Sequence, residues 1–155
     1  MEQSTAKPTL WQAIAAAAQQ LPFSQAKLEE IFSVALSERD HSHNIAFLAG
    51  GGAVLADGCV IDKIDLRIGN AATSFRGFLV LTVSGPCIAL AQVRSHYGDL
   101  LITGVPRGDS LDEATWHSAT LPWGKLSFGF AERNPACLTR IAFEPAPPEP
   151  APRGT

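Results

Sequence analysis

The chain has 155 residues, a length that suits one domain of ordinary size. Its residues are 46% hydrophobic and 17% charged, and the formal net charge is −3. A slightly acidic chain without a basic run lacks the charge with which proteins bind nucleic-acid backbones, so we expect no nucleic-acid partner.

Targeting signals are not evident in the sequence. The N-terminus lacks the basic and apolar parts of a signal peptide, and the apolar run at 14–18 is too short to cross a bilayer. We therefore expect a cytoplasmic protein without a membrane partner. The proline-rich end, residues 145–155, predicts a disordered tail behind a single domain at 1–144.

Two helices are expected first. Pro8 suits the first turn of a helix over residues 9–20. Ser24 is a candidate N-cap for a second helix that runs from Gln25 to about residue 38. Its apolar stripe has helical spacing and consists of Leu28, Ile31, Phe32, Ala35 and Leu36.

The rest of the chain reads as β-strands. In residues 59–68, Ile64, Leu66 and Ile68 alternate with charged residues, which is typical of a strand with one buried face. Asp57-Gly58 is a hairpin-turn signal between strands at 54–56 and 59–61. Further strands are expected at 45–48, 78–83, 87–95, 100–105, 116–121, 125–131 and 138–143.

This order of elements predicts the fold class. Helices followed by a run of strands favour an α+β domain, in which two N-terminal helices pack on a curled antiparallel sheet of about five to seven strands.

Cysteine and histidine do not form a recognisable site. Cys59, Cys87 and Cys137 lie far apart beside apolar residues, so we interpret them as small buried hydrophobic residues and not as a disulfide framework or reactive thiols. His41 and His43 could face one side and bind a metal or haem, but their polar neighbours favour a helix exit. We expect no metal and no cofactor.

Catalytic motifs are also missing from the sequence. There is no Gly-x-Ser-x-Gly elbow, and Gly50-Gly51-Gly52 precedes an apolar strand where a phosphate loop would precede a helix. We interpret the three glycines as a flexible turn, and we expect a protein without enzymatic activity.

One segment is rich in the residue types that dominate protein interfaces. Between 97 and 123 it combines aromatic residues, arginine and acids, much of it in predicted loops. The expected partner-binding residues are Tyr97, Asp99, Arg107, Asp109, Asp112 and Trp116. Because four of the ionisable residues in this segment are acidic, a basic protein is the expected partner.

The sequence thus predicts a non-catalytic protein that binds another macromolecule, as inhibitors, immunity-type proteins and chaperone-like proteins do, and a homodimer is compatible with it. The alternative is a domain that binds a small molecule, such as an apolar ligand or haem, or that acts as an enzyme. Its pocket would lie between the helices and the curled sheet, lined by Leu66, Leu81, Phe128 and Phe130.

Overall fold

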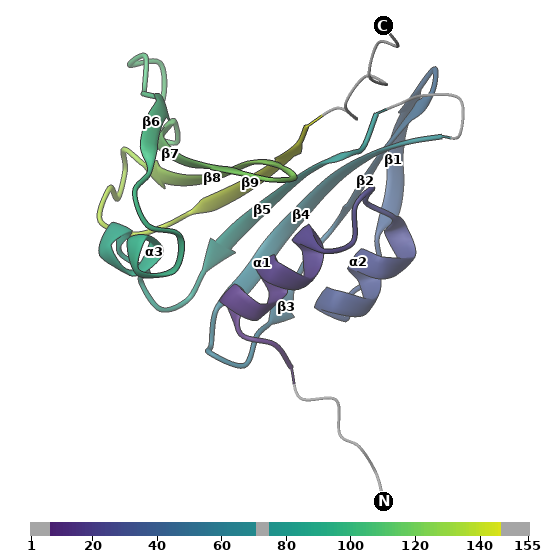
Figure 1. Ribbon diagram of the computed structural model, residues 1–155, viewed down its shortest axis with the longest axis horizontal. Coiled ribbons are helices and arrows are strands. Elements are labelled where there is room, and N and C mark those ends of the chain that lie inside the picture. The colour runs from purple at the N-terminus through teal and green to yellow at the C-terminus, as the bar shows by residue number, and fades with distance from the viewer. Residues whose placement is uncertain (1–6, 71–74, 147–155) are drawn as a thin grey trace, which may run out of the picture.

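The computed structural model describes residues 7–70 and 75–146 and contains, in that part of the chain, three helices and nine strands (Figure 1). In chain order they are α1 (Leu10–Ala18), α2 (Gln25–Phe32), β1 (Ser37–Ser42), β2 (Ile45–Gly50), β3 (Ala53–Val54), β4 (Val60–Gly69), β5 (Phe78–Ser84), α3 (Leu90–Tyr97), β6 (Leu101–Gly104), β7 (Ala114–Leu121), β8 (Gly124–Ala131) and β9 (Arg140–Pro145).

All nine strands belong to one antiparallel sheet. Its order is β1-β2-β4-β5-β9-β8-β7-β6, and β3 pairs with Val60 and Ile61 at the start of β4. The sheet curls and stays open, with β1 and β6 as its edges, while α1 and α2 cover one face (Figure 1). The predicted α+β class with two N-terminal helices on a curled antiparallel sheet is confirmed, although the sheet has more strands than the expected five to seven.

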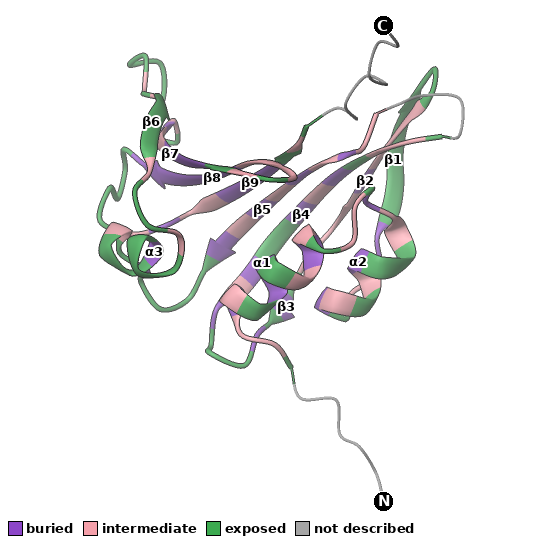
Figure 2. Ribbon diagram, viewed as in Figure 1, coloured by how far each residue is buried: buried purple, intermediate pink, exposed green. Residues whose placement is uncertain are grey.

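The core lies between the helices and the sheet face they cover. Because neighbouring residues of a strand point to opposite faces, alternate residues of the central strands β4 and β5 enter this core. Its buried residues include Leu48, Ile64, Leu66, Leu79, Leu81, Leu126, Phe128, Ile141 and Phe143 from the sheet and Leu10, Ile14, Leu28 and Phe32 from α1 and α2. Figure 2 shows buried segments on the central strands and on both helices. The sheet face without these helices is left for other contacts.

The predicted hairpin at Asp57-Gly58 is confirmed, since β3 pairs with β4 across it. Asp57 does more than form the turn. Its carboxylate accepts hydrogen bonds from the backbone N–H of Cys59, at 3.2 Å, and of Leu10, at 3.0 Å. The turn therefore holds the first residue of α1.

The second helix is shorter than predicted. It ends at Phe32, because Ser33 adopts the left-handed conformation with φ of 54°. Leu36 is buried, as predicted, but in the non-helical segment before β1, where its N–H donates to the Glu29 carboxylate at 2.7 Å. Residues expected at the helix end form β1 instead, and His43, also with positive φ, lies in the β1–β2 turn.

The strand predicted at 87–95 is wrong, because most of it forms α3. The side chain of Gln92 accepts the N–H of Ala89 at 2.9 Å, which fixes the first turn of the helix. Only Val93 of α3 is fully buried, so the apolar residues that suggested a strand lie mainly in a loop and on a partly exposed helix.

Two glycines permit close approaches between segments. A Cβ atom on Gly50 would lie 2.6 Å from the carbonyl oxygen of Ala35, and one on Gly51 would lie 2.1 Å from that of Asp62. Asp62 is the irregular residue in the β4–β5 pairing. These glycines therefore fit a crowded crossing, where the sequence suggested a flexible turn.

The sheet extends beyond the expected domain boundary at 144. Pro145 pairs with Gly124, and the N–H of Ala146 donates to the Trp123 carbonyl at 2.8 Å. The rest of the expected tail, 147–155, lies outside the described residues. No helix in the described part of the chain combines the length and apolar character needed to cross a membrane.

Candidate functional site: the open face of the sheet

The sheet face that α1 and α2 do not cover carries a continuous set of polar, aromatic and charged side chains. We call it the open face and define it by Phe47, Lys63, Asp65, Arg67, Phe78, Val80, Thr82, Trp116, Lys125, Ser127, Arg140, Ala142 and Glu144. Register explains the set, because each of these residues alternates along its strand with a neighbour that enters the core.

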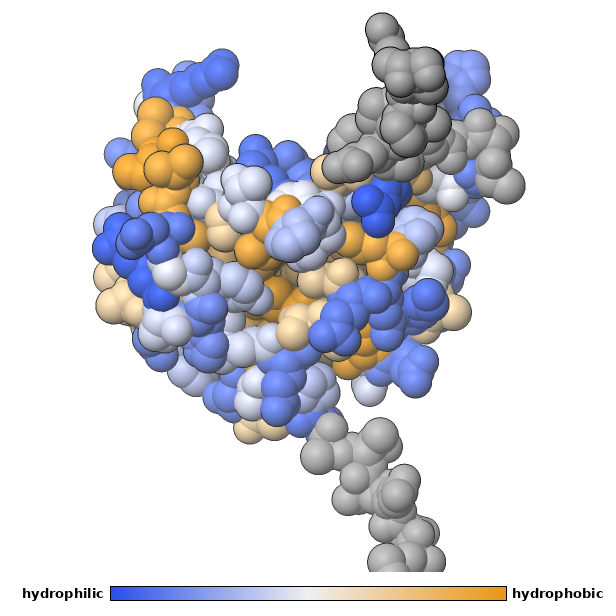
Figure 3. Space-filling model, in the orientation of Figure 1, coloured by the Kyte–Doolittle hydropathy of each residue, from blue (hydrophilic) through white to orange (hydrophobic). Residues whose placement is uncertain are grey.

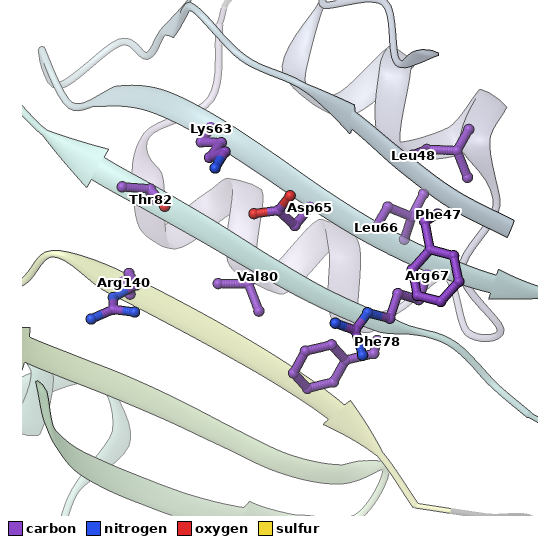
Figure 4. Close-up of a pocket in the computed structure, with 10 residues that line it drawn as sticks. All are labelled: Phe47, Leu48, Lys63, Asp65, Leu66, Arg67, Phe78, Val80, Thr82 and Arg140. Atoms are coloured by element: carbon purple, nitrogen blue, oxygen red, sulfur yellow. The ribbon is translucent and has the colours of Figure 1, made fainter. Parts of the chain in front are cut away.

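Arg67 lies between two phenylalanines at one end of the open face. In the sheet register it is opposite Phe47 on β2 and opposite Phe78 on β5. Its guanidinium carbon is 5.1 Å from the centre of the Phe47 ring and 5.6 Å from that of Phe78 (Figure 4). Cation–π contacts of this kind hold the guanidinium in place and leave its N–H donors for a ligand.

A hollow of about 400 Å³ occupies the middle of the open face. Its floor comes from β4 and β5, where Asp65 lies opposite Val80 and Lys63 opposite Thr82 (Figure 4). Lys63, Arg67 and Arg140 surround it, against the single carboxylate of Asp65. In residues 7–70 and 75–146, no ion pair involves Lys63, Arg67 or Asp65. The hollow therefore carries a net positive charge.

Arg140 connects this hollow to a second one. Its guanidinium carbon lies 5.7 Å from the centre of the Trp116 ring, and its Nη2 donates to the carbonyl oxygen of Asp112. The second hollow, of about 280 Å³, shares Phe78, Val80 and Arg140 with the first. The two hollows thus form one shallow, extended depression across β4, β5, β9 and β8.

Hydroxyl groups lie along the far side of the second hollow. Thr103 Oγ1 and Ser118 Oγ are 2.7 Å apart, and Ser118 Oγ is 2.7 Å from Ser127 Oγ. Ser118 and Ser127 are buried, and these hydrogen bonds satisfy hydroxyl groups whose burial would otherwise destabilise the fold.

The loop between β6 and β7 borders the open face and is ordered by Glu113. The Glu113 carboxylate accepts the backbone N–H groups of Arg107, Asp109 and Ser110 at 3.2, 2.8 and 3.0 Å. These bonds favour the charged form and lower the pKa of Glu113. The preceding residue, Asp112, pairs with Arg133 at 3.0 Å. The carboxylates of Asp112 and Glu113 therefore both have partners within the chain.

The structure brings together only some of the predicted partner-binding residues. Asp112 and Trp116 meet at Arg140 beside the open face, and the exposed Arg107 and Asp109 lie in the Glu113-ordered loop. Tyr97 lies on the opposite side of the sheet.

Tyr97 is half-buried against the core. Its ring centre is 5.4 Å from that of Phe128 and 6.3 Å from that of Trp11, and burial raises the pKa of its hydroxyl. Trp116 pairs with Gly129, the residue after Phe128, and so faces the other way. Asp99 follows α3 and is exposed. The predicted surface is thus two separate regions.

The residues that the sequence did not indicate as binding residues are Phe47, Arg67, Phe78 and Arg140. The strand pattern marked Lys63, Asp65 and Arg67 as a solvent-facing set. The pattern does not reveal the strand order, which places β9 next to β5 and thereby brings Arg140 to the hollow.

The cysteines correct another prediction. Cys59 is buried, and burial together with Asp57 and Asp62 raises the pKa of its thiol to about 11, which suits the structural role expected of it. Cys87 and Cys137 instead form a disulfide with a Cα–Cα distance of 5.0 Å. The residues are 50 apart in sequence, and the tertiary fold brings them together, so spacing alone could not reveal the pair.

The histidines considered for metal or haem are exposed. His41 Nδ1 lies 3.1 Å from a Glu38 carboxylate oxygen on β1, and His43 lies in the adjoining turn. Within the described ranges, no three His, Cys, Asp or Glu side chains are grouped as metal ligands.

Comparison with known proteins adds no relative to this picture. A scan against protein-family models found no match, and searches of curated proteins and of solved structures found no significant match either.

Proposed function

We propose that this protein is a non-catalytic binding protein that holds an extended segment of a protein partner on its open face. The observation that carries the proposal is a pair of arginines that contact aromatic rings, Arg67 with Phe47 and Phe78, and Arg140 with Trp116. They lie on either side of the first hollow. Aromatic residues and arginine are the types that contribute most to binding at protein interfaces.

The groups with shifted pKa values lie away from the open face. Groups prepared for acid–base or nucleophilic chemistry usually have shifted pKa values within a cleft. Among the described residues the resolved shifts belong to Cys59, Tyr97, Glu113 and His117. None of these four lines either hollow of the open face.

The charge of the open face favours an acidic partner segment. The loop acids suggested a basic partner, but Asp112 and Glu113 already bind groups of the chain itself. Lys63 and Arg67, by contrast, have no ion-pair partner in the described part of the chain. A segment that carries carboxylates between apolar side chains would match the depression. An inhibitor, an immunity-type protein or a chaperone would each use such a surface.

The interior is less suited to the alternative of a small-molecule pocket. Leu81 and Phe128 are fully buried and Phe130 is 3% exposed, so these inward positions are filled by packed side chains. A small ligand would therefore bind in a surface depression, such as the one on the open face.

The disulfide bears on the compartment. We expected the cytoplasm, where thiols are kept reduced, whereas a disulfide persists in oxidising compartments. The Cys87–Cys137 bond therefore supports an oxidising compartment. The prediction of no nucleic-acid partner is unchanged, since the net charge is −3.

Site-specific photocrosslinking tests the proposal. A benzophenone amino acid at Thr82, which lines the first hollow, should capture a defined protein when the variant is expressed in the native host. The matched control carries the same group at Glu30, an exposed position on α2 on the other side of the sheet. Capture of the same protein at both positions, or at Glu30 alone, would contradict the proposal.

A further inference from the structure

The two edges of the sheet differ in chemistry. An edge strand offers unpaired backbone N–H and C=O groups, which proteins usually protect with charge, irregularity or cover. β1 reads Ser-Glu-Arg-Asp-His-Ser and is exposed throughout, so it is protected by its polar side chains. β6 reads Leu-Ile-Thr-Gly and has no charged residue, and its only protection of this kind among the described residues is an irregularity in its pairing with β7 between Ile102 and Gly104.

The apolar side chains of the β6 edge are strongly exposed. Leu101 is 73% exposed and Ile102 is 61% exposed, and Val105, just after the strand, is 64% exposed. They contribute to the apolar patch over β6 at the upper left of the space-filling view (Figure 3). Neighbouring exposed apolar residues at an open strand edge are typical of an interaction site.

The sequence around β6 is complementary to itself when it is reversed. When two copies of this segment pair antiparallel about Thr103, Leu101 of each copy lies opposite Val105 of the other. The same register places Asp99 opposite Arg107 at both ends. No ion pair joins Asp99 to Arg107 inside the described chain, so both charges are available to a second molecule.

We propose that β6 pairs antiparallel with β6 of a second copy of this chain, about a two-fold axis at Thr103. Apolar cross-strand pairs and two Asp99–Arg107 ion pairs stabilise the dimer, as closed two-fold symmetry requires the same contacts on both chains. Pro106 ends the pairing, because it has no N–H to donate. The interface is short, so the dimer is weak, with a dissociation constant in the range of ~1–100 µM.

This dimer would extend the candidate site. Thr103 lines the second hollow of the open face together with Trp116. Pairing at β6 therefore places the Trp116 ends of two open faces next to each other. The proposal does not depend on what binds there, since no residue of β6 lines the first hollow.

Sedimentation velocity over a concentration series tests the pairing. The wild-type protein should move from monomer to dimer as its concentration rises from about 1 µM to about 500 µM. Leu101→Lys should shift this midpoint at least ~10-fold upward, because two lysines would face apolar residues across the axis. Val54→Lys is the matched control, since Val54 is 51% exposed on β3, and it should leave the midpoint unchanged.

Charge reversal tests the register. Asp99→Arg and Arg107→Asp should each weaken the dimer, and the double variant should restore it, since the ion pairs then form with reversed sign. A cysteine at the axis, Thr103→Cys, should cross-link two copies under mild oxidation, because facing residues of antiparallel strands lie within disulfide reach.

Three results would overturn the proposal. The first is a wild-type protein that stays monomeric at the highest concentration. The second is a dimer unaffected by Leu101→Lys. The third is a charge-reversed double variant that stays as weak as the single variants. In the first case, binding of a strand of the photocrosslinked partner at the β6 edge would identify that partner, and not a second copy, as the occupant.

Discussion

At the scale of single residues, carboxylates that bind backbone groups hold this fold at the places where elements meet. Asp57 joins a hairpin turn to the start of α1, and Glu29 joins α2 to the segment before β1. Glu113 orders the loop at the open face. A hydrogen bond to a charged acceptor contributes more to stability than one to a neutral acceptor. These carboxylates therefore stabilise the fold although they lie at or near the surface.

Leu28 and Glu30 provide a direct test of the faces of α2. Leu28 is fully buried, so Leu28→Ala should lower the free energy of unfolding by about 2–5 kcal/mol. Glu30 is exposed, and Glu30→Ala should lower it by less than about 0.5 kcal/mol. Glu29 would be a poor control because its carboxylate accepts the N–H of Leu36. Equal effects in urea denaturation would contradict the packing of α2.

His117 should make stability depend on pH. It is 9% exposed and its Nδ1 has no hydrogen-bond partner among the described residues. Burial first, and the charge of Arg94 second, lower the pKa of His117 from its ordinary value of 6.5. The unfolded chain therefore binds a proton at a higher pH than the folded chain does.

The free energy of unfolding should accordingly fall as the pH drops below about 6.5 towards the lowered pKa. Urea denaturation of wild type and His117→Gln between pH 7 and pH 5 measures this contribution, and the variant should show a flatter dependence. His43→Asn is the control, because His43 is exposed and asparagine tolerates its positive φ. Identical pH profiles for wild type and His117→Gln would reject the explanation.

At the scale of elements, the sequence predicted best where periodicity was strong. The alternation in β4 and the spacing of α2 around Leu28 and Phe32 correspond to buried faces in the structure. It failed where tertiary contacts override local pattern. Leu36 has helical spacing but is buried in a non-helical segment, and β1 has no apolar residue that would mark a strand.

The candidate site was less predictable for a similar reason. Trp116 and Asp112 were singled out by residue type, and they do lie beside Arg140. The open face itself depends on strand order, because β9 enters the sheet between β5 and β8. No local pattern indicates that insertion, so the grouping of Arg67 and Arg140 around one hollow could not be read from the chain.

The loop of residues 106–113 should lose its order when Glu113 is removed. Glu113→Ala deletes the acceptor for three backbone N–H groups, so the peptide bond after Arg107 should become more accessible to trypsin. The initial cleavage rate there should rise several-fold, whereas Asp109→Ala, which keeps the acceptor, should change it little. An unchanged rate in Glu113→Ala would show that the loop is ordered by other contacts.

At the scale of the whole molecule, the disulfide joins two connections that lie far apart in sequence. Cys87 lies between β5 and α3, and Cys137 lies between β8 and β9. The closed segment therefore contains α3 and the strands β6, β7 and β8, which form the half of the sheet that ends at the β6 edge.

Loss of this bond should destabilise the protein. For a separation of 50 residues, chain entropy predicts a stabilisation of about 4 kcal/mol. Cys87→Ser/Cys137→Ser should therefore have a clearly lower Tm than wild type, and a reductant should lower the Tm of wild type alone. Thiol counting on protein from the native source checks the premise, since three free thiols would contradict the bond.

The central claim is that the open face binds the partner. Titration calorimetry with the purified partner, once photocrosslinking has identified it, tests this claim most directly. Phe78→Ala removes one ring that holds Arg67 and lines both hollows, so it should raise Kd by about 30-fold, which corresponds to about 2 kcal/mol. Glu30→Ala should bind like wild type. If Phe78→Ala, shown by circular dichroism to be folded, binds as tightly as wild type, the open face is not the binding surface.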